Sequence, residues 1–181
     1  MKLEEFEGKK VLILGFGREG SDTFSFLKKR FPEGIFGVAD KKNISDFSPA
    51  LQRIVRSAKG IALHLGADYL KAAGEYDIIA RSPGVPLRQL KPFLPKGGRV
   101  TSQADIFLDE CKGTVVGVTG TKGKSTVASL IHAVLSRGGK RAHLVGNIGK
   151  PALSLLASIK PEDAVVYELS SFQLMGLKKS P

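Results

Sequence analysis

The segment with the clearest chemistry is residues 117–126, which read GVTGTKGKST between an apolar run and the helical run VASLIHAVL. In a loop between a strand and a helix, main-chain N–H groups can wrap phosphates, a lysine can reach the β and γ phosphates, and a hydroxyl can ligate Mg²⁺. The strict G-x4-GK[ST] spacing is not met, because the glycines fall at Gly117 and Gly120 and not at Val118. The flanking elements still favour a phosphate-binding loop over an incidental glycine-rich turn.

A second glycine-rich turn, GFGREG at residues 15–20, follows the apolar run VLIL and opens a helical segment. Glycines let the backbone approach a pyrophosphate at the positive end of a helix dipole. Asp40 ends the next expected strand, about 20 residues further on, where such folds often bind a ribose hydroxyl. The same kind of turn also packs a helix onto a strand without binding anything. On this motif alone, dinucleotide binding and a packing role stay equally open.

Glu168 follows the apolar run AVVY. An acid at the C-terminal end of a parallel strand lies where the sites of open α/β sheets collect. Such an acid can also face solvent without a role, and both interpretations stay open at this point.

The other reactive side chains show no catalytic or metal-ligating pattern. Cys111 is expected to be a small buried or linker thiol. Ser170 and Ser171 have no His and Asp partners at a recognisable spacing, so a hydrolase triad is not supported. No metal-ligand spacing links the three histidines, which are His64, His132 and His143.

The elements that must position these residues alternate between short apolar runs and longer helical segments, which predicts βαβ units and a parallel sheet. Strands are expected at residues 10–15, 35–40, 61–65, 77–81, 99–102, 115–119, 141–145 and 164–168. One helical stripe contains Phe24, Leu27 and Phe31, and the helix should stop at Pro32 and Gly34. A second stripe, with Ser48 as cap and Pro49 at the first helical position, contains Leu51, Ile54, Val55 and Ala58.

A domain boundary is expected near residues 90–98, because LKPFLPKGG is rich in Pro and Gly. Residues 99–102 could still complete the first sheet. We therefore place the break after Ser102, which gives domains of residues 1–102 and 103–181.

The composition, with 181 residues, 42% hydrophobic and 25% charged, is that of an ordinary globular protein. A single cysteine excludes an intramolecular disulfide and favours a reducing compartment, so the cytoplasm is expected. The chain has no secretory segment and no run of about 18 apolar residues, so no membrane partner is expected. The net charge of +11 is spread over pairs of basic residues and not along a stripe, which argues against a nucleic-acid partner.

Five collinear motifs carry a resemblance to a known family. TGTKGKST, at residues 119–126, is similar to the variant phosphate loop of the Mur ligase and folylpolyglutamate synthase superfamily. GNIG at residues 146–149 and ELSSFQL at residues 168–174 resemble the next two motifs, and ELSSFQL points to the D-glutamate-adding branch. Upstream, SPGV at residues 82–85 and QADIF at residues 103–107 resemble the nucleotide-binding domain and the interdomain segment of that branch. By these motifs the chain is identified as a member of the Mur ligase family.

The resemblance implies an α/β fold with a Rossmann-like parallel-sheet N-terminal domain that holds a UDP moiety. The first part of a P-loop-type α/β ATP-binding domain follows it. The resemblance also implies that the protein is an amide-bond ligase of peptidoglycan precursor synthesis, with ATP and Mg²⁺ as cofactors. The γ-phosphate of ATP passes to a carboxylate, and the amine of D-glutamate attacks the acyl phosphate. The substrates implied are UDP-N-acetylmuramoyl-L-alanine and D-glutamate, and a monomer is expected.

Roles carried over from the family fall on matching positions. Lys124 would neutralise the β and γ phosphates, Ser125 and Glu168 would hold Mg²⁺, and Asn147 would lie near the metal and substrate. The residues expected around ATP are Gly117, Thr119, Gly120, Thr121, Lys122, Gly123, Lys124, Ser125 and Thr126. The residues expected around the uridine nucleotide are Gly15, Phe16, Gly17, Arg18, Asp40, Lys41, Ser82 and Gly84.

Two features depart from the family. Lys122 stands where many relatives carry Asn. The family's central domain also continues beyond this point, with a later lysine and histidine that help bind the metals, and a third domain follows. We therefore expect the chain by itself to be an incomplete fragment without ligase activity.

Alternative functions stay open at this point. An NAD(P)-dependent oxidoreductase would explain residues 15–20 but leave residues 117–126 idle, and a nucleotide-binding regulatory module would explain both. Within the superfamily, ligases for other amino acids and the folate branch are the nearest alternatives, and the N-terminal nucleotide domain argues against the folate branch.

Overall fold

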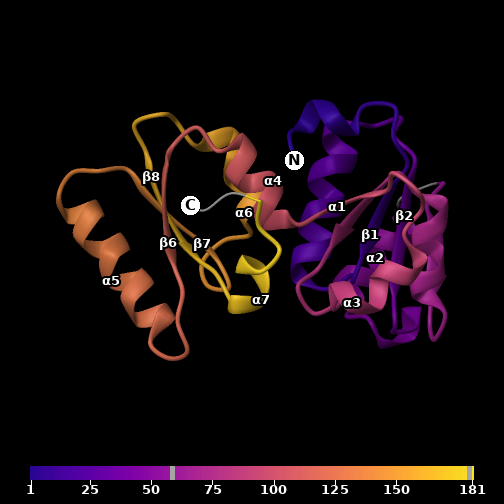
Figure 1. Ribbon diagram of the computed structural model, residues 1–181. Coiled ribbons are helices and arrows are strands. Elements are labelled where there is room, and N and C mark those ends of the chain that lie inside the picture. Colours follow the sequence, from indigo (N-terminus) through magenta and orange to yellow (C-terminus); the bar gives the residue numbers. More distant parts are fainter. Residues whose placement is uncertain (58–59, 179–180) are drawn as a thin grey trace. The chain divides into compact units, whose positions relative to one another are not determined.

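The computed structural model describes residues 1–57, 60–178 and 181, which divide into two compact units (Figure 1). Unit 1 is Met1–Gln103 and unit 2 is Ala104–Pro181. We expected the break one residue earlier, after Ser102. Each unit is an α/β structure built on a parallel sheet, so the expected fold class is confirmed.

The described residues of unit 1 form a five-stranded parallel sheet. β1 and β4 lie at its centre and are buried along their whole length, as expected for parallel strands that are covered on both faces. In spatial order the strands are β3 (Ala62–Leu65), β2 (Phe36–Asp40), β1 (Val11–Leu14), β4 (Ile78–Arg81) and β5 (Arg99–Thr101). Each overlaps the strand expected from the sequence.

The helix α1 (Arg18–Arg30) packs on one face of this sheet, where a Cβ added at Gly20 would meet Ile13. Its buried Phe24 and Leu27 confirm the expected stripe, and the helix ends just before Pro32. On the opposite face, Leu12 and Leu14 pack with residues of the short helices η3 (Tyr69–Glu75) and α3 (Leu87–Leu90). The remaining helices of the unit are η1 (Leu3–Phe6), η2 (Ile44–Asp46), α2 (Pro49–Ser57) and η4 (Lys91–Phe93).

The helix α2 begins at Pro49, and the Ser48 Oγ accepts a hydrogen bond from the Leu51 N–H at 3.4 Å, so the expected cap is present. Val55 is buried and belongs to the expected stripe. Ala58, the last residue of that stripe, lies outside the described residues.

The described residues of unit 2 form a parallel sheet in the order β6 (Thr114–Val118), β8 (Ala164–Glu168), β7 (Ala142–Gly146). The central strand β8 is fully buried. The helix α5 (Lys124–Arg137) packs through Ala128 against Val118 and Val166. Phe107, from α4 (Gln103–Glu110), packs edge-on against Tyr167 of β8, with ring centroids 5.2 Å apart. The short helices α6 (Ala152–Leu155), η5 (Leu156–Ser158) and α7 (Ser171–Leu174) complete the unit.

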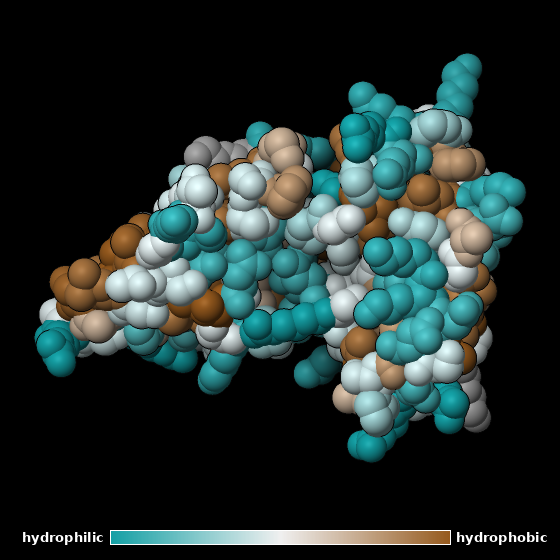
Figure 2. All heavy atoms as spheres, turned by 90° about the horizontal axis from the view of Figure 1, so that it is seen from below, coloured by the Kyte–Doolittle hydropathy of each residue, from teal (hydrophilic) through white to brown (hydrophobic). Residues whose placement is uncertain are grey.

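One side of α5 is exposed although it is apolar. Val127, Leu130 and Val134 are 48%, 63% and 61% exposed, at the spacing of a helical stripe. Figure 2 shows hydrophobic surface on the part of unit 2 where α5 lies. In the part of the chain that the structure describes, no helix is long and apolar enough to cross a membrane.

Candidate functional sites

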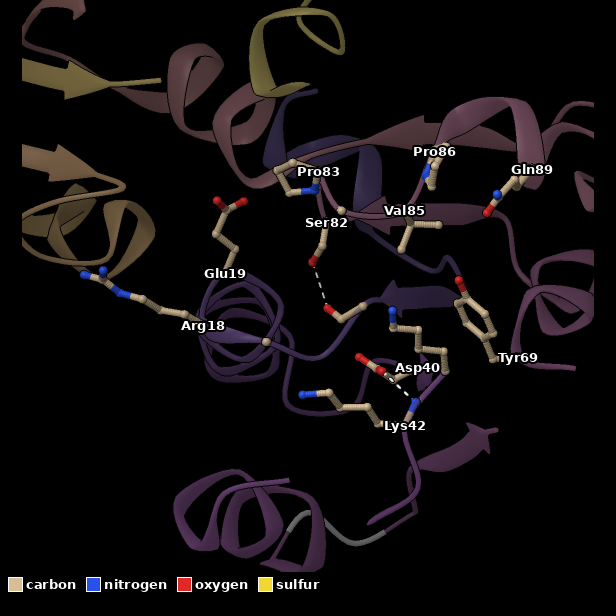
Figure 3. Close-up of a pocket in the computed structure, with 14 residues that line it drawn as sticks. Arg18, Glu19, Asp40, Lys42, Tyr69, Ser82, Pro83, Val85, Pro86 and Gln89 are labelled. Atoms are coloured by element: carbon tan, nitrogen blue, oxygen red, sulfur yellow. Dashed lines mark hydrogen bonds between the residues drawn. The ribbon is translucent and has the colours of Figure 1, made fainter. Parts of the chain in front are cut away.

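A cavity of about 630 Å³ opens at the C-terminal ends of the strands of unit 1 (Figure 3). The chain passes from β1 outward to β2 and β3, and then returns to the other side of β1 for β4 and β5. Ligands of open α/β sheets bind at this kind of switch point, and the volume suits a small-molecule ligand. The lining residues are Gly15, Gly17, Arg18, Glu19, Asp40, Lys41, Lys42, Tyr69, Ser82, Pro83, Gly84, Val85, Pro86 and Gln89.

The glycine-rich turn of this cavity is fixed by close backbone packing. Gly15 has a φ of +88°, and a Cβ there would lie 2.8 Å from the Cβ of Ser82. A Cβ at Gly20 would lie only 2.0 Å from the carbonyl oxygen of Gly15. These two glycines therefore let the turn fold back on itself. Gly17 caps α1 with open space around it, so an anion can approach the N-terminus of this helix beside Arg18.

Two side chains hold the turn from opposite sides. The Ser82 hydroxyl donates to the Gly15 carbonyl at 2.8 Å. The Asp40 carboxylate accepts from the Phe16 N–H at 2.6 Å and from the Lys42 N–H at 2.9 Å. Asp40 therefore clamps the glycine-rich turn to the end of β2 and also forms part of the cavity wall.

The structure corrects the expectation for Phe16, which is the one predicted uridine-site residue that does not line the cavity. Its side chain is 1% exposed and packs against Phe24 and Phe47, with ring centroids 6.0 and 5.9 Å apart. Sequence alone could not distinguish these positions, because an aromatic residue between two glycines suits the core as well as a ligand.

Arg81, which had no expected role, is buried at the end of β4 with 8% exposure. Its guanidinium donates to the Val85 carbonyl at 2.6 Å and, more weakly, to the Ser82 carbonyl at 3.4 Å. Burial lowers the pKa of this guanidinium. Arg81 thus stabilises the turn that carries Ser82 and Gly84, two residues that line the cavity.

Several other lining residues were not predicted: Glu19, Lys42, Tyr69, Pro83, Val85, Pro86 and Gln89. Most lie beside a predicted residue. Tyr69 and Gln89 follow β3 and β4 at some distance, and only the rule that sites collect at strand ends could have suggested them.

The second candidate site is the loop between β6 and α5 of unit 2. Gly120 has a φ of +147°, and Gly123, which caps α5, has a φ of +74°, so both positions favour glycine. The Lys124 ammonium donates to the Gly120 carbonyl at 2.8 Å, which places its charge over the loop. Gly117 lies inside β6 opposite Tyr167, one strand position before the loop begins. The exposed residues of the predicted site are Gly117, Thr119, Gly120, Thr121, Lys122, Gly123, Ser125 and Thr126.

Glu168 lies at the same edge of the sheet as this loop, since it pairs with Val118 of β6 and Gly146 of β7. Its side chain is 3% exposed, and its Oε2 is buried without a hydrogen-bond partner among the described residues. A buried carboxylate oxygen without a partner is costly, and a bound cation would satisfy it. The described residues contain no group of three His, Cys, Asp or Glu suited to a metal. A Mg²⁺ held by one carboxylate, a hydroxyl and nucleotide phosphates fits this donor set.

Asn147 is brought next to Glu168 by a tight turn. A Cβ at Gly146 would lie 2.2 Å from the Glu168 carbonyl, and the Asn147 N–H donates to that carbonyl at 3.2 Å. The Asn147 side chain donates to the Oε1 of buried Gln173 at 3.4 Å. Gln173 was not predicted, and it links Asn147 to the helix after Glu168.

The histidines and the cysteine have structural partners. His64 pairs with the Tyr76 hydroxyl at 3.0 Å, His132 with the Ala142 carbonyl at 3.2 Å and His143 with Asp163 at 2.9 Å. Burial raises the pKa of the half-buried Cys111 thiol, which disfavours a reactive thiolate.

Comparisons with known proteins agree with the motifs. Residues 118–179 match the family model of the Mur ligase middle domain. UDP-N-acetylmuramoylalanine–D-glutamate ligase from Ruminiclostridium cellulolyticum is 35% identical over 99% of this chain and 39% of that protein. The proteins of the same name from Exiguobacterium sibiricum and Streptococcus pneumoniae are each 32% identical over 98% of this chain and 39% of the relative.

Among solved structures, a pseudomurein peptide ligase type C from Methanothermus fervidus is 27% identical, with a TM-score of 0.48. The match covers 91% of this chain and 33% of that one. The chain thus spans 39% of the length of each of the three curated relatives named above.

Proposed function

The chain belongs to the Mur ligase family, and we propose that it serves the ATP-dependent ligation of D-glutamate to UDP-N-acetylmuramoyl-L-alanine in peptidoglycan precursor synthesis. The single observation that carries this proposal is the pairing of two different glycine-rich sites in one chain. One is a nucleotide-sized cavity at the switch point of unit 1. The other is a loop beside the unpaired carboxylate oxygen of Glu168 in unit 2.

Unit 1 binds the UDP moiety in this proposal. The exposed N-terminus of α1 and the Arg18 guanidinium provide positive charge for a diphosphate. Gly15 and Gly17 let the backbone come close to it. The cavity walls formed by Asp40, Lys41, Ser82 and Gly84 surround the remainder of the nucleotide.

Unit 2 binds ATP and Mg²⁺ in this proposal. ATP supplies the phosphoryl group that activates the substrate carboxylate as an acyl phosphate, and Mg²⁺ neutralises phosphate charge. The main-chain N–H groups of residues 119–123 wrap the phosphates, and Lys124 neutralises the β and γ groups. Ser125 and Glu168 hold the metal, and Asn147 lies beside Glu168 where it can orient the substrate.

The surroundings of the reaction are part of the same proposal. A cytoplasmic monomer without a nucleic-acid or membrane partner suits the single cysteine and the scattered basic residues. An oxidoreductase that uses NAD(P) would leave the loop of unit 2 without a task.

Calorimetry on the chain tests the proposal. UDP-N-acetylmuramoyl-L-alanine and ATP with Mg²⁺ should each bind, and NADH should give no heat. Tight NADH binding without a heat from the UDP ligand would overturn the assignment of unit 1.

A further inference from the structure

The cavity of unit 1 has two chemically different ends. Figure 3 shows Arg18 and Glu19 at one side and Tyr69 and Gln89 at the other, with Ser82 and Asp40 between them. The first end is the N-terminus of α1, which suits the negative charge of a diphosphate. The second end offers an aromatic ring, which suits a flat, uncharged group. A nucleotide has the same two parts, so the cavity predicts the direction in which it lies.

The position of Tyr69 is fixed by the turn that follows β3. The Gly66 N–H donates to the Asp40 carbonyl at 3.0 Å, and the Tyr69 N–H donates weakly to the Gly66 carbonyl at 3.4 Å. The φ of Gly66 is +90°, a conformation that favours glycine. The turn therefore attaches Tyr69 to the end of β2, next to the Asp40 that clamps the glycine-rich turn.

The Tyr69 side chain is half-buried, with two kinds of neighbour. It packs against the core cluster that contains Leu14, Val85 and Leu90, and it also lines the cavity. Burial, and then the negative charge of Asp40, raise the pKa of its hydroxyl. A ring that is backed by the core loses little freedom when a ligand binds, and a base stacked on such a ring gains on the order of 5- to 100-fold in affinity.

We propose that Tyr69 is the platform on which the pyrimidine base of the uridine nucleotide stacks, with the diphosphate at the Arg18 end. The inference rests on the proposed UDP-binding function of unit 1. It adds a residue for the base, whereas the glycine-rich turn and Arg18 serve the phosphates. Stacking uses the ring face, so the Tyr69 hydroxyl is dispensable.

Binding of UDP and of inorganic pyrophosphate to the 181-residue chain separates the two ends of the cavity. Tyr69→Leu keeps an apolar side chain on the core and should weaken UDP binding by about tenfold, with pyrophosphate binding unchanged. Tyr69→Phe should bind UDP like the original chain. Tyr76→Phe is the matched control, because the buried Tyr76 bonds to His64 and does not line the cavity.

Nuclear Overhauser effects measured on the unaltered chain test the contact without any substitution. In a chain with ring-labelled tyrosine, the H5 and H6 protons of bound UDP should show effects to the ring protons of one tyrosine. These effects should be absent in Tyr69→Phe, because that variant has no labelled ring at position 69. UDP that binds without such effects, or equally well to Tyr69→Leu, would overturn the stacking role alone. A chain that binds no uridine nucleotide at all would instead overturn the proposed function.

Discussion

The two units build their glycine-rich sites in different ways. In unit 1 the side chains of Asp40, Ser82 and Arg81 are bonded to the backbone of the site, so they shape the cavity from within. In unit 2 glycine conformation shapes the loop, and the side chains of Lys122, Ser125 and Thr126 are exposed.

The two units also differ in how completely their apolar residues are buried. Both faces of the sheet in unit 1 are covered by buried residues, whereas α5 of unit 2 leaves an apolar stripe exposed. The difference teaches that a substitution in the glycine-rich turn of unit 1, or in a side chain bonded to it, should affect both ligand binding and stability. In the loop of unit 2 the two effects can be separated.

The largest effect is expected from Leu14→Ala in unit 1. The Leu14 side chain is fully buried in the core cluster, and removing it should lower the free energy of unfolding by about 2–5 kcal/mol. Leu130→Ala in α5 is the matched variant, because Leu130 is 63% exposed, and its effect should stay within about 0.5 kcal/mol. Urea titrations followed by hydrogen exchange report each unit separately. Equal losses for both variants would abolish the comparison.

Lys124→Ala should weaken ATP binding in the presence of Mg²⁺ by about 10- to 100-fold, because it removes a charge-assisted hydrogen bond to phosphate. The fold should persist, since the observed partner of the ammonium is one loop carbonyl. In a chain of the relatives' full length the same change should abolish ligation. Lys140→Ala, at an exposed position after α5, is the control. A well-folded Lys124→Ala protein with unchanged ATP affinity would refute the assigned role.

Gly20→Ala should lower both the stability of unit 1 and its affinity for UDP. The added Cβ would overlap the Gly15 carbonyl, so the turn must open, at a cost of about 1–3 kcal/mol, and UDP binding should weaken in parallel. Gly74→Ala is the matched control, because its nearest neighbour would be an ordinary contact at 3.6 Å. Melting temperatures and UDP affinities measured together check this expectation. A Gly20→Ala protein that loses UDP binding at full stability would show that the glycine-rich turn and the core are separable here too.

The smallest effect concerns Asp163, which is buried in unit 2. A hydrogen bond from the Lys160 N–H, and then one with His143, lower the pKa of this carboxyl. Its contribution to stability is therefore present above about pH 4, the pKa in the unfolded chain, and is lost as the pH falls through the folded value.

Asp163→Asn should flatten the loss of stability of unit 2 as the pH falls below about 4, measured by urea titration at several pH values. Asp68→Asn is the control, since Asp68 forms an exposed ion pair with Lys71. If the stability of unit 2 depends on pH in Asp163→Asn as it does in the original chain, Asp163 does not make this contribution.

Much of the fold could be predicted from sequence, because most strands, such as β1 and β8, contain a short apolar run. The observed bounds of the strands differ from the expected ones by about one residue. At β6 and β7 the hydrogen-bonded pairing with β8, and not the apolar run, determines where the strand ends. The loop of unit 2 could be predicted because its shape depends on local glycine conformation.

The cavity of unit 1 could be predicted only in part. Phe16 was misassigned because its burial depends on tertiary packing against Phe24 and Phe47. Tyr69 and Arg81 belong to no motif. Their roles come from the sheet order, which brings the ends of β2, β3 and β4 to one edge.

Hydrogen exchange with each ligand tests most directly the central claim that the units carry two different nucleotide sites. UDP should slow amide exchange in residues 15–20 and 82–86 of unit 1, and ATP with Mg²⁺ should slow it in residues 119–126 of unit 2. NADH should leave residues 15–20 unchanged. Protection of residues 15–20 by NADH and not by UDP, or of residues 119–126 by UDP and not by ATP, would contradict the account.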